Sequence, residues 1–211
     1  MKKLTEGRQR LWQEAGLDEF RLPEIPDNQA PANALVITCS ESTVLSAFVA
    51  SLDPLCILQN LGGTLPTSLD DVGWDTVAYA LGKMGLRHVV FCGHFECCTT
   101  ASWQTVNEAL PTEFGVRNDR QLAEQLDVGS ELPAAKRTSQ LWLVEQILQM
   151  DAYLTHSSRL GDADVKVHAL WFDEDQHQVS AYSSDHRKFV LMDQHDFEQL
   201  LDILRADREK V

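Results

Sequence analysis

The sequence predicts an α/β fold, with a central, mostly parallel sheet flanked by helices and an N-terminal helical arm. Short apolar runs rich in β-branched residues indicate buried parallel strands at residues 34–37, 55–58 and 87–91. The amphipathic segment 75–84 lies between the last two runs and is followed by Gly85, a residue type that commonly ends helices. This strand, helix and strand spacing is typical of the right-handed crossover units that build parallel sheets.

The remaining elements of the core are expected after residue 94. Residues 165–171 are interpreted as a fourth strand, and residues 178–182 are expected to pair with it as an edge hairpin. The sequence favours helices at residues 99–110, 139–154 and 194–204. The polar stretch between the first two of these helices is not assigned to any element.

The N-terminal segment differs from the rest of the chain. Residues 6–20 combine charged side chains with an apolar face, which predicts an amphipathic helix, and the next thirteen residues contain three prolines that break it. We therefore expect residues 1–33 to form a helical arm with a Pro-rich connector, and residues 34–211 to form a single α/β domain. A chain of 211 residues with 44% hydrophobic content is long enough for one well-buried core.

Composition excludes several classes of function. The formal net charge of −14 argues against nucleic acid and anionic membrane surfaces as partners, because both attract basic proteins. No apolar run approaches the length that crosses a bilayer, and no apolar leader follows the basic N-terminus. The five cysteines form an odd set in a chain without an export signal. We expect a cytoplasmic protein with reduced thiols.

Two short segments that directly follow apolar runs carry side chains that bind zinc. Cys39 and Glu41 follow the first strand, and His94 and Cys97 follow the third. Because the carboxyl ends of neighbouring parallel strands emerge at one edge of a sheet, where α/β folds place their ligands, these side chains are expected to converge. Two thiolates, an imidazole and a carboxylate form a complete ligand set for one Zn²⁺ ion.

The alternative is that these residues are structural. Cys39, Cys97 and Cys98 would then be small buried hydrophobes and His94 a core histidine, and spacing alone does not choose between the two interpretations. A structural role is favoured for the cysteines and histidines inside the strand patterns, which are Cys56, Cys92, His88 and His168.

The order of these segments resembles that of the β-class carbonic anhydrases. The family motif Cys-x-Asp-x-Arg after the first strand corresponds to residues 39–43, which read Cys-Ser-Glu-Ser-Thr. The motif Gly-His-x-x-Cys-Gly after the third strand corresponds to residues 93–98, which read Gly-His-Phe-Glu-Cys-Cys. The resemblance continues through the turn at 58–63, the helix at 75–81 and the strand at 167–173, which is similar to the late motif His-Gly-Trp-x-Tyr-Asp.

This resemblance implies a cofactor and an assembly. Zn²⁺ is expected to be bound by Cys39, His94 and Cys97, so that residues 34–211 form a zinc-binding domain. The chain is expected to form a homodimer or a higher homo-oligomer in which the N-terminal helix packs on the partner subunit, as in the family.

Four positions depart from the family pattern. In the family, the aspartate is held by the arginine and accepts a hydrogen bond from the zinc-bound water, whereas Glu41 and Thr43 stand at these positions here. Threonine has no guanidinium fork to hold a carboxylate. In the expected substrate cleft, Gln59 replaces the turn arginine and Cys98 replaces a glycine.

Glu41 can therefore take one of two roles. As a fourth zinc ligand it would close the site, and this arrangement is slightly favoured; as a general base or hydrogen-bond acceptor for zinc-bound hydroxide it would leave the site open. The family chemistry is reversible hydration of carbon dioxide by zinc hydroxide, with carbon dioxide or bicarbonate as the bound small molecule, and we expect it to be impaired or altered here. Two alternatives are a non-catalytic binding, regulatory or scaffold homologue, and a zinc hydrolase or lyase acting on another small electrophile.

Overall fold

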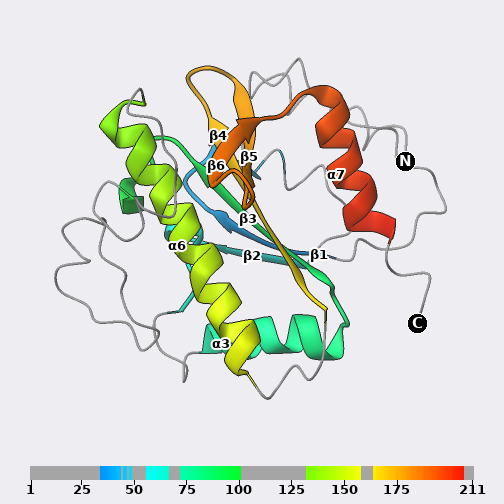
Figure 1. The fold of residues 1–211 in the computed structure, drawn as a ribbon. Helices are drawn as coiled ribbons and strands as arrows, with labels where there is room; N and C mark the ends of the chain where they lie inside the picture. Colours follow the sequence, from blue (N-terminus) through cyan, green and yellow to red (C-terminus); the bar gives the residue numbers. More distant parts are fainter. Residues whose placement is uncertain are drawn as a thin grey trace, which may run out of the picture.

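The described part of the chain forms one six-stranded sheet (Figure 1). The computed structural model describes residues 34–43, 45–46, 48, 56–66, 72–100, 132–157 and 164–206. In spatial order the strands are β2-β1-β3-β4-β5-β6, with β1 to β4 parallel and β5 and β6 antiparallel. The strand bounds are Ala34–Cys39 (β1), Cys56–Asn60 (β2), His88–His94 (β3), Lys166–Asp173 (β4), Gln178–Ser183 (β5) and Lys188–Leu191 (β6). The expectation of a mixed, mostly parallel sheet is confirmed.

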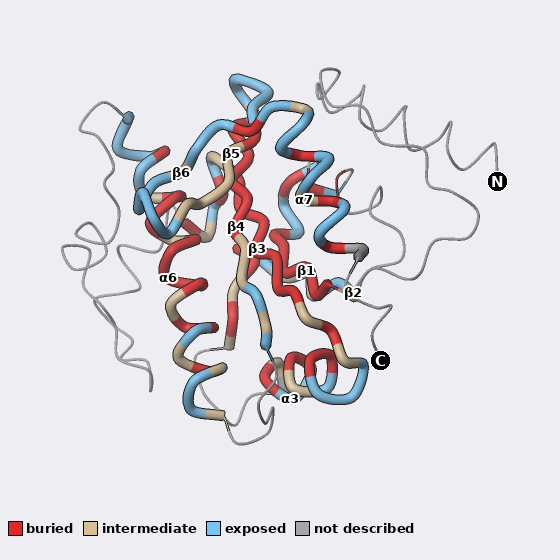
Figure 2. The backbone as a smooth tube through the Cα atoms, turned by 45° about the vertical axis from the view of Figure 1, so that its right-hand side comes forward, coloured by how far each residue is buried: buried red, intermediate tan, exposed pale blue. Residues whose placement is uncertain are grey.

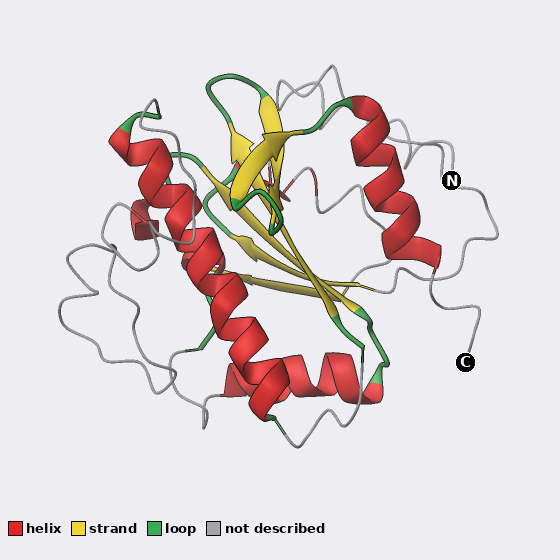
Figure 3. Ribbon diagram, in the orientation of Figure 1, coloured by secondary structure: helices red, strands yellow, loops and turns green. Residues whose placement is uncertain are grey.

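Helices cover both faces of the sheet (Figure 3). One face packs against α7, and the other packs against α3, η2 and α6. The helix bounds are Leu61–Gly63 (η1), Val72–Ala78 (α3), Tyr79–Lys83 (η2, a π-helical turn), Ala134–His156 (α6) and Gln194–Ala206 (α7). Among the described residues, no helix has the length and apolar character needed to span a membrane.

Burial on both faces explains why the central strands have continuous apolar sequences. Along β1, Val36 packs in the cluster under α7, whereas Leu35 and Ile37 pack in the cluster under α3 and α6. Every residue of β1 and β3 is buried, as the red central strands in Figure 2 show. Such strands cannot alternate between apolar and polar residues, because neither face reaches water.

Helix α6 lies close to the sheet and is held there by polar contacts. An added Cβ at Gly93 of β3 would lie 2.8 Å from Leu143 of α6, so only glycine permits this approach. Trp171 Nε1 donates to Ser139 Oγ at 2.9 Å, and Lys136 Nζ forms a buried ion pair with Asp173. These contacts fix the helix over the carboxyl ends of β3 and β4.

Several sequence-based bounds need correction. The strand expected at 55–58 is β2, which begins at Cys56 and continues to Asn60, and the strand expected at 87–91 continues to His94. The helix expected at 75–84 begins at Val72 and ends in a π-helical turn before Gly85, whose φ is 71°.

The C-terminal half also differs in detail from the sequence-based expectation. The helix expected at 139–154 begins at Ala134. The strand at 178–182 forms the expected hairpin with β4, but it is not the edge strand, because the four-residue strand β6 follows it. So short a strand after a polar turn carries no clear periodicity. The final helix is confirmed, whereas the arm at 1–33 and most of the helix at 99–110 lie outside the described residues.

Candidate metal centre

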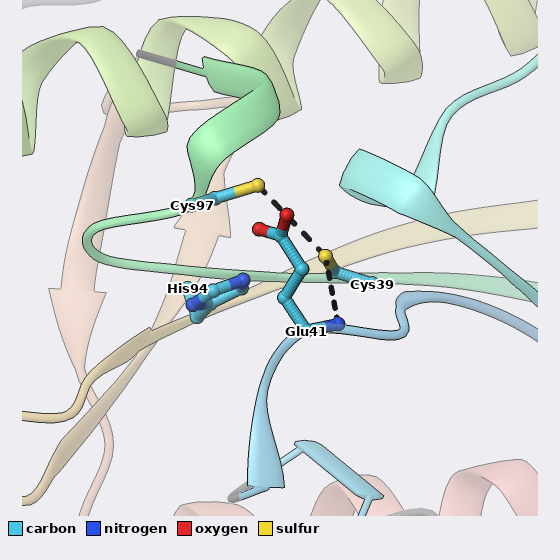
Figure 4. Close-up of side chains that lie close together, drawn as sticks. All are labelled: Cys39, Glu41, His94 and Cys97. Atoms are coloured by element: carbon cyan, nitrogen blue, oxygen red, sulfur yellow. Dashed lines mark hydrogen bonds between the residues drawn. The ribbon is translucent and has the colours of Figure 1, made fainter.

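Four side chains converge at the carboxyl edge of the parallel strands (Figure 4). Cys39 is the last residue of β1 and His94 is the last residue of β3, while Glu41 and Cys97 follow in the loops after these strands. One ligand atom from each of the four side chains lies within 4.8 Å of the corresponding atoms of the other three. Within the described part of the chain, this is the one group of three or more histidine, cysteine and acidic side chains with metal-binding geometry.

The donor set fits zinc. The Sγ atoms of Cys39 and Cys97 lie 3.8 Å apart. Two sulfurs bound to one tetrahedral zinc at about 2.3 Å each would lie about 3.8 Å apart, so the pair already has the required spacing. His94 Nε2 is buried and has no hydrogen-bond partner among the described residues, which leaves its lone pair available to a metal.

A glycine turn shapes the surroundings of Cys39. Gly62 N and Glu41 N lie 3.2 and 3.4 Å from Cys39 Sγ, so that both amides donate to the sulfur. Gly62 has a φ of 81°, and an added Cβ would lie 2.6 Å from Thr99. Trp142 Nε1 of α6 donates to Gly62 O at 3.0 Å. The turn therefore requires glycine and is held against the sulfur by α6.

A tight turn after β3 presents His94 and Cys97 to the same point. Phe95 N donates to Phe172 O at 2.9 Å, which continues the pairing of β3 with β4 up to the turn. Glu96 then takes a positive φ of 61°, which is uncommon for a residue with a side chain. Thr100 Oγ1 donates to Cys97 O at 2.9 Å and stabilises the helical turn that follows. The reversal at Glu96 explains how residues three apart reach one ion.

The two thiols share a proton unequally. A hydrogen bond from Cys39, aided by His94, lowers the pKa of Cys97 to about 3 although burial opposes it. The same hydrogen bond, together with burial, raises the pKa of Cys39. Burial by itself lowers the pKa of His94, but Cys97 and Glu174 outweigh it and the pKa is raised. The lowered pKa of Cys97 favours its thiolate form, whereas metal binding has to displace the proton of Cys39.

Glu41 lies beside the metal ligands on an exposed loop. Its Oε2 accepts a hydrogen bond of 2.9 Å from Cys98 N, and its carboxylate lies close to both sulfurs (Figure 4). Cys98 is exposed, whereas its neighbour Cys97 is buried. Thr43 is exposed and begins the next helical turn. Gln59 is exposed on β2, where its backbone pairs with Thr38. Of the predicted site residues outside the Cys-His-Cys set, Glu41 alone joins the ligand group.

Two residues of the site were not predicted from sequence. Glu174 directly follows β4, and its Oε1 lies 3.4 Å from His94 Nδ1. Ser42 donates a hydrogen bond from its hydroxyl to the same oxygen of Glu174. A signal was present, because β4 is parallel to β3 and an acidic run at its carboxyl end must emerge at the same edge. The histidines assigned a structural role, His88 and His168, contact each other with ring nitrogens 3.0 Å apart.

Comparisons with known proteins agree with this architecture. Residues 34–179 match the family model described as carbonic anhydrase. The chain is 24% identical to beta carbonic anhydrase 1 of Caenorhabditis briggsae over 217 residues, covering 81% of this chain and 80% of the relative. It is 25% identical to the carbonic anhydrase of Pseudomonas aeruginosa over 177 residues, covering 79% and 80%. The solved structure of the beta-carbonic anhydrase CcaA is similar in fold, with a TM-score of 0.56, 21% identity and coverage of 94% of this chain and 96% of that chain.

Proposed function

The chain belongs to the β-class carbonic anhydrase family and has a Cys39, His94 and Cys97 site typical of zinc binding in it, and we propose that its hydration of carbon dioxide is absent or strongly impaired. The observation that carries this proposal is the position of Glu41. An oxygen of its carboxylate lies within 4.8 Å of the ligand atoms of Cys39, His94 and Cys97, so it belongs to the ligand group itself. These three residues would hold the zinc, and Glu41 would fill the fourth position.

Residues around Glu41 support a closed site. A zinc ion with an open position acts as a Lewis acid toward water and small electrophiles, which is the chemistry that a fourth protein ligand blocks. Thr43, at the position of the family arginine, is exposed at the start of a helical turn and offers a neutral hydroxyl, with no charged fork to draw the carboxylate away. A zinc ion bound by the three ligands would therefore be the positive charge with which the Glu41 carboxylate pairs.

One contact favours a second candidate, in which the site is open and active. The hydrogen bond of 2.9 Å from Cys98 N holds one oxygen of Glu41 and is able to keep the carboxylate beside the metal instead of on it. Glu41 would then accept a proton from a water molecule next to the ligands and act as a general base. The physiological small molecule would be carbon dioxide or bicarbonate in this case.

Zinc content and hydration activity test the proposal directly. We expect one zinc per chain in the wild type, and loss of stoichiometric zinc in Cys39→Ser and Cys97→Ser. Cys56→Ser is the matched control, because Cys56 lies on β2 outside the ligand group. Stopped-flow hydration assays should show a rate at least about a hundredfold below that of an active family member, the usual cost of losing a preorganised charged group. Ordinary turnover by the zinc-loaded wild type would refute the proposal.

The role of Glu41 is tested by substitution. If Glu41 closes the zinc site, Glu41→Ala should open a position that azide or thiocyanate can occupy, visible in the absorption spectrum of the cobalt-substituted protein. The double variant Glu41→Asp, Thr43→Arg should gain hydration activity, because the arginine pairs with the aspartate. X-ray absorption spectra showing water as the fourth ligand in the wild type would instead support the open site.

We also propose that the protein self-associates into a homodimer or higher homo-oligomer. Apolar side chains are exposed at the edge of the sheet, where Ile57 of β2 is 45% exposed and Leu61 of η1 is 63% exposed. Among the described residues β2 is the outermost strand on this side of the sheet, and exposed apolar residues on such a strand favour contact with another chain. Light scattering coupled to size exclusion should give a mass above that of a monomer, and Ile57→Lys should reduce it.

A further inference from the structure

Glu174 occupies a position that connects two halves of the metal centre. It directly follows Asp173, the last residue of β4, and therefore lies one residue beyond the end of the late family motif. Its Oε1 accepts a hydrogen bond from the Ser42 hydroxyl and lies 3.4 Å from His94 Nδ1. The loop after β1 and the histidine at the end of β3 thus meet on one carboxylate oxygen.

The two ring nitrogens of His94 have different surroundings. Nδ1 faces the Glu174 carboxylate, whereas Nε2 is buried without a hydrogen-bond partner among the described residues. A neutral imidazole has one N–H and one lone pair, and a neighbouring carboxylate takes the N–H. This arrangement favours the tautomer with the proton on Nδ1, in which the lone pair of Nε2 faces the metal site.

We propose that Glu174 is a positioning residue of the zinc site, which fixes the tautomer and orientation of His94 through Nδ1. The inference deepens the proposed function and rests on zinc binding by His94. Carboxylates that accept the second N–H of a metal-binding histidine raise the basicity of the ligand and hold its ring in place. The two carboxylates of the site consequently have separate roles, with Glu41 among the ligand atoms and Glu174 behind the histidine.

Ser42 makes Glu174 part of a larger connection. Leu45 N donates to Ser42 Oγ at 3.0 Å, so Ser42 caps the helical turn that begins at Thr43 while its own proton goes to Glu174. Because Ser42 is the residue after Glu41, Glu174 also restrains the loop that carries the candidate fourth ligand. This connection is made by Glu174 and does not require an arginine at position 43.

Zinc affinity, measured by competition with a chromophoric chelator, tests the inference without any assay of activity. Glu174→Ala should weaken zinc binding by about 10- to 100-fold, the usual effect of removing such a partner. Glu174→Gln should lose less, because its amide oxygen still accepts the Nδ1 proton. The matched control is Asp175→Asn, an exposed acidic residue in the same turn. Equal affinity in Glu174→Ala and the control would overturn the proposal.

Two further measurements separate positioning from a general structural role. In nitrogen-15 spectra of the zinc-loaded protein, His94 should be protonated at Nδ1, and this proton should exchange with water faster in Glu174→Ala than in the control. The loss of affinity should remain in a Ser42→Ala background, because it acts through His94 and not through the cap. Zinc binding through Nδ1, or disappearance of the effect in that background, would refute the inference.

The proposed function and this inference fail in different ways. If the wild type hydrates carbon dioxide at an ordinary rate while Glu174→Ala binds zinc more weakly, the closed site is wrong and the role of Glu174 stands. If hydration is absent and Glu174→Ala binds zinc as tightly as the control, the closed site stands and the role of Glu174 is wrong.

Discussion

Removal of Lys136 should destabilise the fold around the metal centre more than an ordinary surface substitution. Lys136 of α6 forms an ion pair with Asp173 at the end of β4, and the two side chains are 10% and 4% exposed. The ammonium also lies 5.0 Å from the centroid of the Phe95 ring, next to His94. Asp173 is in turn bonded to the loop before β5, since its Oδ1 accepts from Gln176 N at 3.3 Å.

The size of the effect follows from the burial of this pair. In Lys136→Met the apolar stem is largely retained, but the Asp173 carboxylate is left buried without its counter-charge. Breaking a buried ion pair in this way costs about 3–5 kcal/mol. The free energy of unfolding of a domain is about 5–15 kcal/mol, so the variant should be folded but clearly weakened. Lys136→Met with Asp173→Asn should recover much of the loss, because no unpaired charge then remains buried.

Urea unfolding of the zinc-free protein, followed by circular dichroism, measures these differences apart from metal binding. Lys83→Met is the control, because Lys83 is exposed on η2. A loss below about 1 kcal/mol for Lys136→Met, the range of an exposed ion pair, would refute the assignment of a buried charge pair. The same conclusion would follow if the double variant were less stable than the single one.

Two further predictions concern the sheet. Burial, with His88 and Lys166 nearby, lowers the pKa of His168 from 6.5 to about 4. As the pH falls, the unfolded chain binds this proton before the folded one does, so up to about 3 kcal/mol of stability should be lost between pH 6.5 and pH 4. In His168→Gln, the free energy of unfolding should depend less on pH over this range. Gly93→Ala should cost about 1–3 kcal/mol in urea unfolding, because its Cβ would lie 2.8 Å from Leu143, and a second change, Leu143→Val, should restore part of the loss.

The central sheet and the convergence of Cys39, His94 and Cys97 were predictable from local patterns, whereas the assignment of these residues as zinc ligands came from the resemblance to the family. An apolar run such as 88–91 reports burial on both faces, and the residues that follow a parallel strand must emerge at one edge. Cys39, His94 and Cys97 could therefore be placed together from their positions after two strands. Strand β6 was not predicted, because it is short, lies at the edge and has two exposed apolar residues, Val190 and Leu191.

The contacts around the ligands were not predictable in the same way. The end of β4 places Glu174 at the same edge of the sheet, but its contacts with Ser42 and His94 join distant segments. Glu174 is 132 residues from Ser42, and Lys136 is 37 residues from Asp173. In the sequence, each of these charged residues lies in a polar stretch that looks like a solvent-exposed turn or helix end. Only the docking of α6 and the register of β4 beside β3 bring them to the site. Sequence patterns report which face of an element is buried, but they do not report which polar group lies opposite.

Whether the site is closed or open depends on the position of Glu41, the ligand candidate with the weakest restraints. Cys39 Sγ accepts hydrogen bonds from two backbone amides, whereas the side chain of Glu41 lies on an exposed loop, where its carboxylate accepts a hydrogen bond from Cys98 N. A hydrogen bond to a charged group contributes about 1.5–3 kcal/mol, which corresponds to a ten- to hundredfold change in a population.

One additional contact of similar strength is therefore enough to shift the equilibrium between a carboxylate bound to the metal and a carboxylate held beside it. An arginine at position 43 would supply a bidentate contact at least as strong as the amide of Cys98. For this reason, Glu41→Asp with Thr43→Arg is expected to change the chemistry of the site while leaving the ligands Cys39, His94 and Cys97 in place.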